Sequence, residues 1–283
     1  MAEVLRFSLV VASLGRVDGV RALFDSLLIQ TGISFEVILV DQNPDGRLLS
    51  VVAAFAGRLP IRHVRVEARN SSCARNVGIG LCTGDIVGFP DDDCIYPDGV
   101  LAVVDREFAA DPALMLLTGA AESPEGRLGS GRWWPMRAPI DRRNAFTTVI
   151  CFNLFLRRAL LDRLGGFDEA LGVGAAYGAC EENDLVLRAI GSGAKAVYDP
   201  ALRVVHPDKR LTPAATLRAF RYGAGFGYVL RKHGFGVGVL GGYLLRPVGG
   251  MVVSLAKLRL RHCAYYWHTL RGRWFGYRSF RRP

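Results

Sequence analysis

The sequence predicts an α/β fold, with a mainly parallel sheet flanked by helices and a helical, basic C-terminal extension. Short apolar runs alternate with amphipathic stretches through the first 120 residues, as they do in repeated strand–helix units. A second core segment begins near residue 148, and the part beyond residue 212 is helical in pattern and cationic. We therefore expect one domain at residues 1–212 and a C-terminal region at residues 213–283.

The first strand–helix units follow from the spacing of the apolar residues. Residues 7–12 form a mostly apolar run, which is typical of a buried strand, and apolar side chains then recur at helical spacing up to Gln30. Residues 35–40 repeat the strand pattern and end on Asp41. A second helix and a third strand follow, and Asn70 and Ser71 then offer caps to a third helix.

A fourth strand, at residues 86–90, leads directly into Asp91, Asp92 and Asp93. Asp98 is the expected cap of the helix that follows. In open α/β sheets, ligands bind at the carboxyl ends of the strands, because loops and helix N-termini meet there. The three aspartates therefore lie where a functional site is expected.

The second core segment comes after a long stretch rich in Gly, Pro, Arg and Trp, at residues 122–144, and loops of that length are usually functional or disordered. Later elements are a strand ending near residue 156, a short helix to residue 164, a glycine-rich loop at residues 172–178, a helix at residues 181–190 and a long helix from residue 213 to residue 233.

Charge is distributed unevenly along the chain. The formal net charge is +10, but the part from Ala201 onward holds sixteen Lys or Arg against one acid, Asp208. A basic tail suggests an anionic partner surface, either lipid or nucleic acid. Tyrosines and tryptophans near residues 265–274 favour the bilayer surface, so we expect the inner membrane surface as partner and no nucleic acid.

The apolar region at residues 235–256 is interrupted by Arg246 and Pro247. Each run is then about ten residues long, whereas a spanning helix needs roughly twenty. The sequence thus predicts an interfacial or packed region, with a homo-oligomer contact as the alternative. The start of the chain carries an acid, Glu3, and lacks a cationic signal-like segment, so we expect a cytoplasmic protein attached peripherally to the cytoplasmic face of the membrane.

The aspartate run is also a candidate metal site. Adjacent carboxylates repel one another unless a cation lies among them, and hard oxygen ligands suit Mg²⁺ or Mn²⁺. Protein-bound Mg²⁺ is normally held by one or two carboxylates together with substrate phosphates, which points to a diphosphate-bearing ligand. Taken alone, the run is equally compatible with an acidic loop that has no such role.

Several motifs surround the run in a fixed order: Val10-Val11-Ala12-Ser13, Val40-Asp41, Ala74-Arg75-Asn76-x-Gly78, Gly165-Gly166-Phe167-Asp168-Glu169, Glu181-Glu182-Asn183-Asp184-Leu185 and Val205-His206. Through them the chain resembles the bacterial family-2 glycosyltransferases from roughly Phe7 to Arg221. This resemblance implies the GT-A nucleotide-sugar fold, and metal-dependent, inverting transfer of a hexose-type sugar from a nucleotide diphosphate sugar to a hydroxyl acceptor. The family tendency implies a UDP-sugar.

The resemblance also implies roles for individual residues. Asp41 would accept a hydrogen bond from the base, although a strand-end Asp can also cap a turn. Arg75 would lie beside the diphosphate, or pair structurally with an acid. The implied donor-binding residues are Ala12, Ser13, Asp41, Arg75, Asp91 and Asp92, and the implied ligands of Mn²⁺ or Mg²⁺ are Asp91, Asp93 and His206.

The general base is implied at the acidic helix start, where the family has a Glu-Asp pair. The matching second position is Glu182, one methylene longer than Asp, so Glu182 is the first candidate and Glu181 the second. Asp184 orients the helix or contacts the acceptor. Acids at a helix start are also favourable partners of the helix dipole.

The acceptor is the least defined ligand. Trp133 and Trp134, with Arg132 and Arg137, would suit sugar rings and phosphate, although tryptophans also fill cores. The basic, aromatic tail suggests a lipid-linked or cell-surface glycan as acceptor.

Two other functions stay open. A nucleotidyltransferase would carry a glycine-rich basic loop after its first strand, of which Ser13-Leu14-Gly15-Arg16 is a poor version. A non-catalytic, membrane-associated nucleotide-sugar-binding module would keep the fold without turnover. A dinucleotide oxidoreductase is disfavoured, because no GxGxxG follows the first strand.

Overall fold

The computed structural model describes residues 5–67, 70–129, 133–208 and 211–280. The chain divides into two compact units, and each is assembled from segments that are distant in the sequence. The first unit contains residues 1–69, 73–166 and 185–208, and the second contains residues 70–72, 167–184 and 209–283. The predicted domain boundary between residues 212 and 213 remains a prediction about which part folds independently.

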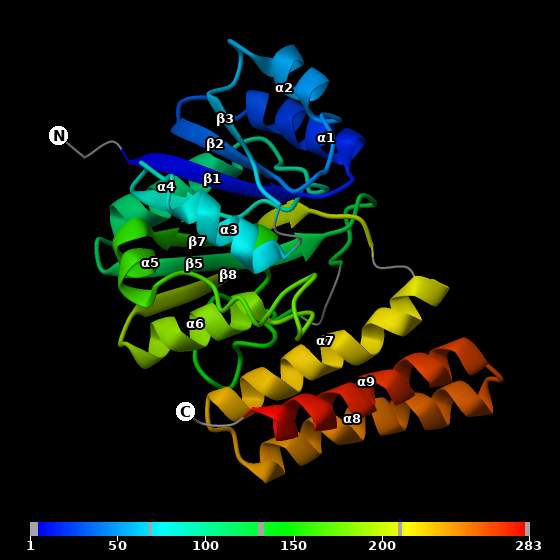
Figure 1. The fold of residues 1–283 in the computed structure, drawn as a ribbon. Helices are drawn as coiled ribbons and strands as arrows, with labels where there is room; N and C mark the ends of the chain where they lie inside the picture. Colours follow the sequence, from blue (N-terminus) through cyan, green and yellow to red (C-terminus); the bar gives the residue numbers. More distant parts are fainter. Residues whose placement is uncertain (1–4, 68–69, 130–132, 209–210, 281–283) are drawn as a thin grey trace. The chain divides into compact units, whose positions relative to one another are not determined.

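The first unit is built on a mixed sheet, which has eight strands within the described residues, in the order β3-β2-β1-β4-β7-β5-β8-β6 (Figure 1). The strands are β1 (Arg6–Ser13), β2 (Ser34–Asp41), β3 (Ile61–Arg65), β4 (Ile86–Gly88), β5 (Leu114–Glu122), β6 (Ala138–Pro139), β7 (Leu154–Arg157) and β8 (Lys195–Val205). The run from β3 to β4 is parallel. Strand β7 is antiparallel to both β4 and β5. The predicted α/β class is confirmed.

Helices cover both faces of the sheet. They are α1 (Val17–Leu28), α2 (Leu49–Phe55), α3 (Ser71–Ile79), α4 (Val100–Ala110), α5 (Arg158–Leu164) and α6 (Glu181–Gly191), with a 3₁₀ turn at Cys151–Asn153. Helices α1, α2 and α4 share one core with Leu9 of β1, and Phe24 meets Phe55 edge-on with ring centroids 5.4 Å apart. Helix α3 packs on the opposite face, because a Cβ at Gly78 would meet Val10, the next residue along β1.

Two predicted helix caps have different outcomes. Asn70 does cap α3, since its Oδ1 accepts a hydrogen bond from the Ser72 N–H at 2.8 Å. Asp98 does not cap α4. The cap residue is Gly99, whose φ of 75° lies in the left-handed region that glycine adopts without strain, and no side chain caps this helix.

The second unit contains α7 (Pro213–Lys232), α8 (Val237–Ala256) and α9 (Leu260–Ser279). Figure 1 shows α9 between α7 and α8, and it packs against both. Small residues allow the backbones of α7 and α9 to approach closely. A Cβ at Gly227 would collide with the Arg273 carbonyl, and one at Gly276 with the Ala224 carbonyl.

Helix α8 is continuous through Pro247, so the two apolar runs on either side of Arg246-Pro247 belong to one helix of 20 residues. A proline has no N–H, which leaves the carbonyl four residues earlier, that of Tyr243, without its helical donor. Arg273 of α9 replaces this donor, because its Nη1 donates to the Tyr243 carbonyl at 2.5 Å. The neighbouring helix therefore compensates for the proline and keeps α8 in one piece.

Candidate functional site

The aspartate run lies just beyond the end of β4, and a backbone pairing brings His206 to it. Ile95 and Val205 exchange two hydrogen bonds, of 2.8 and 3.0 Å. The next residue after Val205 is His206, whose N–H donates to the Glu122 carbonyl at 2.9 Å. Three segments distant in the sequence therefore converge at this edge of the sheet.

Asp91, Asp93 and His206 form a candidate metal site, with their ligand atoms all within 4.8 Å of one another. The His206 Nε2 lies 3.3 Å from the Asp93 Oδ1, and its Nδ1 lies 2.8 Å from the Pro207 carbonyl. Since a carbonyl only accepts, Nδ1 carries the hydrogen, and in the neutral ring the Nε2 lone pair faces the carboxylates. The ring also stacks on Phe152, with centroids 4.6 Å apart. Two carboxylates and an oriented imidazole fit a divalent cation.

Two arginines lie among the same acids. The buried Arg75 side chain reaches from α3 and donates to the Asp91 Oδ1 at 2.8 Å. Arg16, in the loop after β1, pairs with Asp93, and its Nε lies 3.6 Å from the Asp92 Oδ1. These cations offset the repulsion between the carboxylates, and guanidinium groups also suit phosphate oxygens.

The sequence reasoning missed Arg16 as a site residue. It was considered only as the last residue of a poor phosphate loop. The available signal was its place directly after β1, because β1 and β4 are parallel neighbours whose following loops meet at one edge.

Asp92 points into the protein and joins the end of β1 to the loop after β4. Ser13 Oγ donates to the Asp92 Oδ2 at 2.7 Å. Burial raises the pKa of the Asp92 carboxyl. A Cβ at Gly19 would collide with the Asp92 carbonyl, so α1 also approaches this loop closely. Asp92 therefore supports its neighbours, and its predicted contact with the donor remains a prediction.

Asp41 lies at the end of β2, in register with Ser13 of β1, and its carboxylate is fully buried. The Asp41 Oδ1 accepts from the N–H and the Nδ2 of Asn43, at 2.8 and 2.7 Å. The other oxygen, Oδ2, lies 3.0 Å from the Nε2 of His63. Asn43 in turn accepts a hydrogen bond from the Gly15 N–H at 2.7 Å. The sequence reasoning did not identify Asn43 and His63, which surround the predicted base-binding residue.

The turn at Gly165 and Gly166 requires glycine for two reasons. Both residues have positive φ, and a Cβ at Gly166 would lie 2.5 Å from the Asn76 Oδ1. Arg188 of α6 donates to the carbonyls of Leu164 and Gly166, at 2.8 and 2.6 Å. Two motifs that the sequence analysis found separately, around residues 75–76 and 165–166, thus meet beside α3.

The acidic start of helix α6 belongs to the second unit, which contains Glu181, Glu182 and Asp184. All three occupy the first turn of α6, directly after Cys180, whose φ of 70° is left-handed. Asp184 and Glu181 are buried, whereas Glu182 is partly exposed. Of the two candidate bases, Glu182 is the more accessible to an acceptor.

The predicted acceptor residues have unequal surroundings. Trp133 packs against the core and stacks on Tyr198, with centroids 6.3 Å apart, so its ring fills space. Trp134 is 42% exposed. Arg137 is bonded to the carboxylates of Glu107 and Asp199, at 2.5 and 2.7 Å, and Arg132 lies outside the described residues. Trp134 is therefore the better acceptor candidate, and this role stays a prediction.

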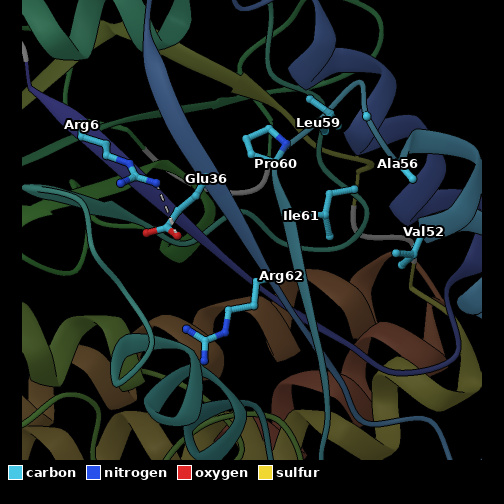
Figure 2. Close-up of a pocket in the computed structure, with 9 residues that line it drawn as sticks. Arg6, Glu36, Val52, Ala56, Leu59, Pro60, Ile61 and Arg62 are labelled. Atoms are coloured by element: carbon cyan, nitrogen blue, oxygen red, sulfur yellow. Dashed lines mark ion pairs between the residues drawn. The ribbon is translucent and has the colours of Figure 1, made fainter.

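A hollow of about 550 Å³, whose lining residues are drawn in Figure 2, lies away from the aspartate run. It is lined by Val52, Ala56, Gly57, Leu59, Pro60 and Ile61, together with the charged residues Arg6, Glu36 and Arg62. Arg6, Glu36 and Ile61 lie at or near the amino ends of β1, β2 and β3. The aspartates follow the carboxyl end of β4, so the hollow is at the opposite edge of the sheet.

Comparison with known proteins gives one family and several relatives. The family described as "Glycosyl transferase family 2" matches residues 8–165. An uncharacterized glycosyltransferase of Bacillus subtilis, YwdF, is 26% identical over 58% of this chain and 62% of that protein. The succinoglycan biosynthesis protein ExoO of Rhizobium meliloti is 27% identical over 74% of this chain and 62% of that protein. The matched region thus spans under two thirds of these relatives.

Solved structures share the fold at low sequence identity. The mannosyltransferase PcManGT from Pyrobaculum calidifontis, in complex with GDP-Man and Mn²⁺, has a TM-score of 0.66 at 15% identity, covering 96% of this chain and 87% of that one. Residues 1–349 of S. aureus TarS, in complex with UDP-GlcNAc, have a TM-score of 0.59 at 15% identity, covering 95% and 91%. These likenesses establish the fold alone.

Proposed function

Because the chain belongs to glycosyl transferase family 2, we propose that it transfers a sugar from a nucleotide diphosphate sugar to a hydroxyl acceptor with the help of a divalent cation. The observation that carries this proposal is the gathering of Asp91, Asp93 and His206 beside Arg16 and Arg75. Carboxylates and an imidazole suit a metal, and the arginines suit phosphate, so the cluster supports a metal-bound diphosphate.

The cation that we propose is Mn²⁺. Mg²⁺ is bound almost entirely through oxygen, whereas the site offers one nitrogen ligand, the Nε2 of His206. The hydrogen bond from His206 Nδ1 to the Pro207 carbonyl keeps the ring oriented and leaves the lone pair on Nε2. The Mn²⁺ in the PcManGT complex is consistent with this choice. When bound, the cation would stabilise the negative charge of the departing diphosphate.

The nucleotide is proposed to lie near Ser13 and Asp41, with a UDP-sugar as the donor. The carboxyl ends of the parallel strands β1 and β2 place these residues in register at one edge of the sheet. The Asp41 carboxylate is fully buried and is contacted by Asn43 and His63, so a base N–H would have to reach the lone pair that these contacts leave on Oδ2. GDP-Man and UDP-GlcNAc, bound by the two structural relatives, are the natural first donors to compare.

The chain's own residues would divide the chemistry as follows. Arg75 and Arg16 bind and orient the diphosphate. Glu182 takes the proton of the acceptor hydroxyl as general base, with Glu181 as the second candidate. The hydroxyl oxygen attacks the anomeric carbon in line and the diphosphate leaves, so one displacement inverts the anomeric centre.

A direct test combines turnover with stereochemistry. The purified chain is incubated with UDP- and GDP-sugars and Mn²⁺, and donor hydrolysis and the anomeric configuration of the product are followed by NMR. Inverted product, and its loss in Glu182→Gln with donor binding retained, would support the proposal. Donor binding without hydrolysis or transfer to any glycan acceptor would instead identify a non-catalytic binding module.

Membrane attachment is proposed for the C-terminal helices. Among the described residues, α8 is long and apolar enough to cross a bilayer by length and composition, and only 17% of its most apolar window is buried. Val237, Leu245 and Val252 are more than half exposed. Lys257 and Arg259 follow directly, so apolar and cationic surface adjoin, as in interfacial helices.

This surface would hold the protein at the cytoplasmic face, near a lipid-linked acceptor. Flotation with vesicles separates the possibilities. We expect the protein to float with vesicles containing phosphatidylglycerol, and less with phosphatidylcholine alone. A protein that stays at the bottom in both cases, and whose mass in light scattering doubles with concentration, would show that the apolar face serves a homo-oligomer.

A further inference from the structure

We propose that Lys232 and His233, at the end of α7, are positioning residues for the transfer reaction. They would fix the first turn of α6, which carries Glu181 and Glu182. The inference rests on the proposed function, because that proposal assigns one of these glutamates the proton of the acceptor.

Asp184 is the direct contact of both residues. Its side chain has no exposed surface, and its Oδ1 lies 2.8 Å from the Lys232 Nζ and 2.8 Å from the His233 Nε2. To bond a carboxylate, the His233 Nε2 must donate its hydrogen. A carboxylate that is removed from water is tolerated when it is paired and hydrogen-bonded, so these two donors determine where Asp184 is stable.

Lys232 also holds the turn that precedes the glycine-rich loop. Its Nζ lies 2.7 Å from the Asp168 Oδ2, and the Asp168 Oδ1 accepts from the Ala170 N–H at 2.9 Å. We call Asp168, Asp184, Lys232 and His233 the anchor cluster. It ties both ends of residues 168–184 to one end of α7.

Residues that lie between the two ends of this segment also contact α7. The ring of Tyr177 stacks on Tyr228, with centroids 4.2 Å apart. The Gly178 N–H donates to the Arg221 carbonyl at 3.2 Å, and a Cβ at Gly225 would collide with the Ala179 carbonyl. The backbone leading into α6 therefore follows the surface of α7.

The residue directly before α6 has a left-handed backbone conformation. Cys180 has a φ of 70°, a conformation that a residue with a side chain keeps only where its surroundings impose it. Its carbonyl accepts the Asp184 N–H at 3.0 Å, which closes the first turn of the helix. The anchor cluster acts on the side chain of that same residue, Asp184, and so stabilises the turn on which both glutamates lie.

Placement of a general base affects the rate more than it affects binding. A displacement of about 1 Å in a reacting group costs on the order of 100-fold in rate. None of the anchor residues belongs to the set proposed to hold the donor. Loosening the cluster should therefore lower kcat while the donor KM changes little.

The test uses the full chain with three variants. Lys232→Met removes the shared cation, and Lys232→Arg restores a donor to both carboxylates. Arg231→Met is the matched control, because Arg231 is exposed and lies over the Tyr277 ring at 5.4 Å. The readouts are kcat and donor KM, and hydrogen exchange of the amides of residues 181–185.

We expect Lys232→Met to lower kcat by about 100-fold, with the donor KM within about twofold and faster exchange confined to residues near 181–185. Lys232→Arg should recover most of kcat, and Arg231→Met should resemble the wild type. The inference is overturned if Lys232→Met keeps its kcat, if Arg231→Met loses as much, or if exchange at residues 181–185 is unchanged. A wild type without turnover would refute the proposed function, while the exchange measurement would still decide whether Lys232 holds this turn.

Discussion

Two acidic clusters in this protein differ in how their charge is compensated. In the first, which we call the donor cluster, Asp91, Asp93 and His206 keep 29%, 20% and 13% of their side-chain surface exposed. In the anchor cluster, Asp184 has none exposed and is held by Lys232 and His233 at one helix end. The first arrangement leaves ligand atoms accessible, and the second does not.

Exposure and internal partners separate binding acids from structural ones. Acids that are gathered and still accessible suit an external cation, whereas a buried acid with internal partners suits a fixed backbone. Substitutions in the donor cluster should therefore affect activity and metal binding. Substitutions in the anchor cluster should also affect the free energy of unfolding.

The largest expected effect is in the donor cluster. Asp93→Ala should lower sugar transfer by about 1000-fold, since a catalytic cation supplies several kcal/mol of charge stabilisation and each 1.36 kcal/mol is tenfold in rate. The melting temperature should change little. Initial rates and calorimetry measure both quantities. Asp45→Ala is the control, because Asp45 is an exposed acid whose ion pair is with Arg47 at the surface. An active Asp93→Ala variant would remove Asp93 from the site.

The second effect is on stability, in the anchor cluster. The double variant Lys232→Met/His233→Leu should lower the free energy of unfolding by about 3 kcal/mol, because it leaves the buried Asp184 carboxylate without these two partners. Urea denaturation measures the change. Arg231→Met should cost no more than about 0.5 kcal/mol. If the double variant were equally mild, Asp184 would not depend on these two side chains and the contrast between the clusters would fail.

The third effect concerns the nitrogen ligand. His206→Gln should weaken Mn²⁺ binding by about tenfold or more, since the oriented Nε2 is lost. Binding of Mn²⁺ to the chain without nucleotide can be followed by electron paramagnetic resonance. His63→Gln is a suitable comparison, because His63 contacts Asp41 and not the donor cluster. Equal Mn²⁺ affinity in wild type and His206→Gln would exclude His206 as a ligand.

The smallest expected effect is the pH dependence of the thermal stability of an Asp92 variant, which distinguishes Asp92 from its two neighbours. Burial raises the pKa of Asp92 above its usual 3.8, so the charged form carries a penalty in the folded protein. The protonated form is favoured at low pH, and the penalty appears as the pH rises through the folded-state pKa. Asp92→Asn should therefore raise Tm at pH 7, and the gain should disappear below about pH 4.

Asp45 is the control, because its pKa is shifted in the opposite direction from that of Asp92. A hydrogen bond from Arg47 lowers the pKa of Asp45 to about 2. The stability from this pair is present above the unfolded value and is lost as the pH falls through the folded pKa, so Asp45→Asn should give no gain at pH 7. A gain for Asp92→Asn that is the same at pH 4 and pH 7 would contradict the role of burial.

The sequence was sufficient for the elements with clear periodicity. Residues 7–12, 35–40, 61–66 and 181–190 match β1, β2, β3 and α6 within a residue or two. Periodicity does not report how strands pair, so the antiparallel insertion of β7 between β4 and β5 could not be predicted. The start of α4 was misplaced by one residue, since Asp98 has the side chain of a cap but Gly99 has the backbone freedom for the turn.

The same limit applies to the candidate site. Motif order indicated Asp91, Asp93 and His206, but their meeting depends on the pairing of Ile95 with Val205, which neither residue reveals. Arg16 and His63 are not part of a recognised motif. They lie at the site because β1, β2, β3 and β4 are parallel neighbours. The apolar runs on either side of Pro247 form one helix, and Arg273 of the separate helix α9 supplies the donor that Pro247 lacks. Contacts over such distances are beyond local patterns.

Metal-dependent binding of the donor is tested by the thermal stability of the wild type and Asp93→Ala with nucleotide diphosphate sugars, with and without Mn²⁺. A ligand that binds only the folded state at 100 times its Kd stabilises it by about 2.7 kcal/mol. We expect a UDP-sugar to raise Tm only in the presence of Mn²⁺, and only in the wild type. An equal rise in EDTA, or in Asp93→Ala with Mn²⁺, would contradict a metal-bound diphosphate at the donor cluster.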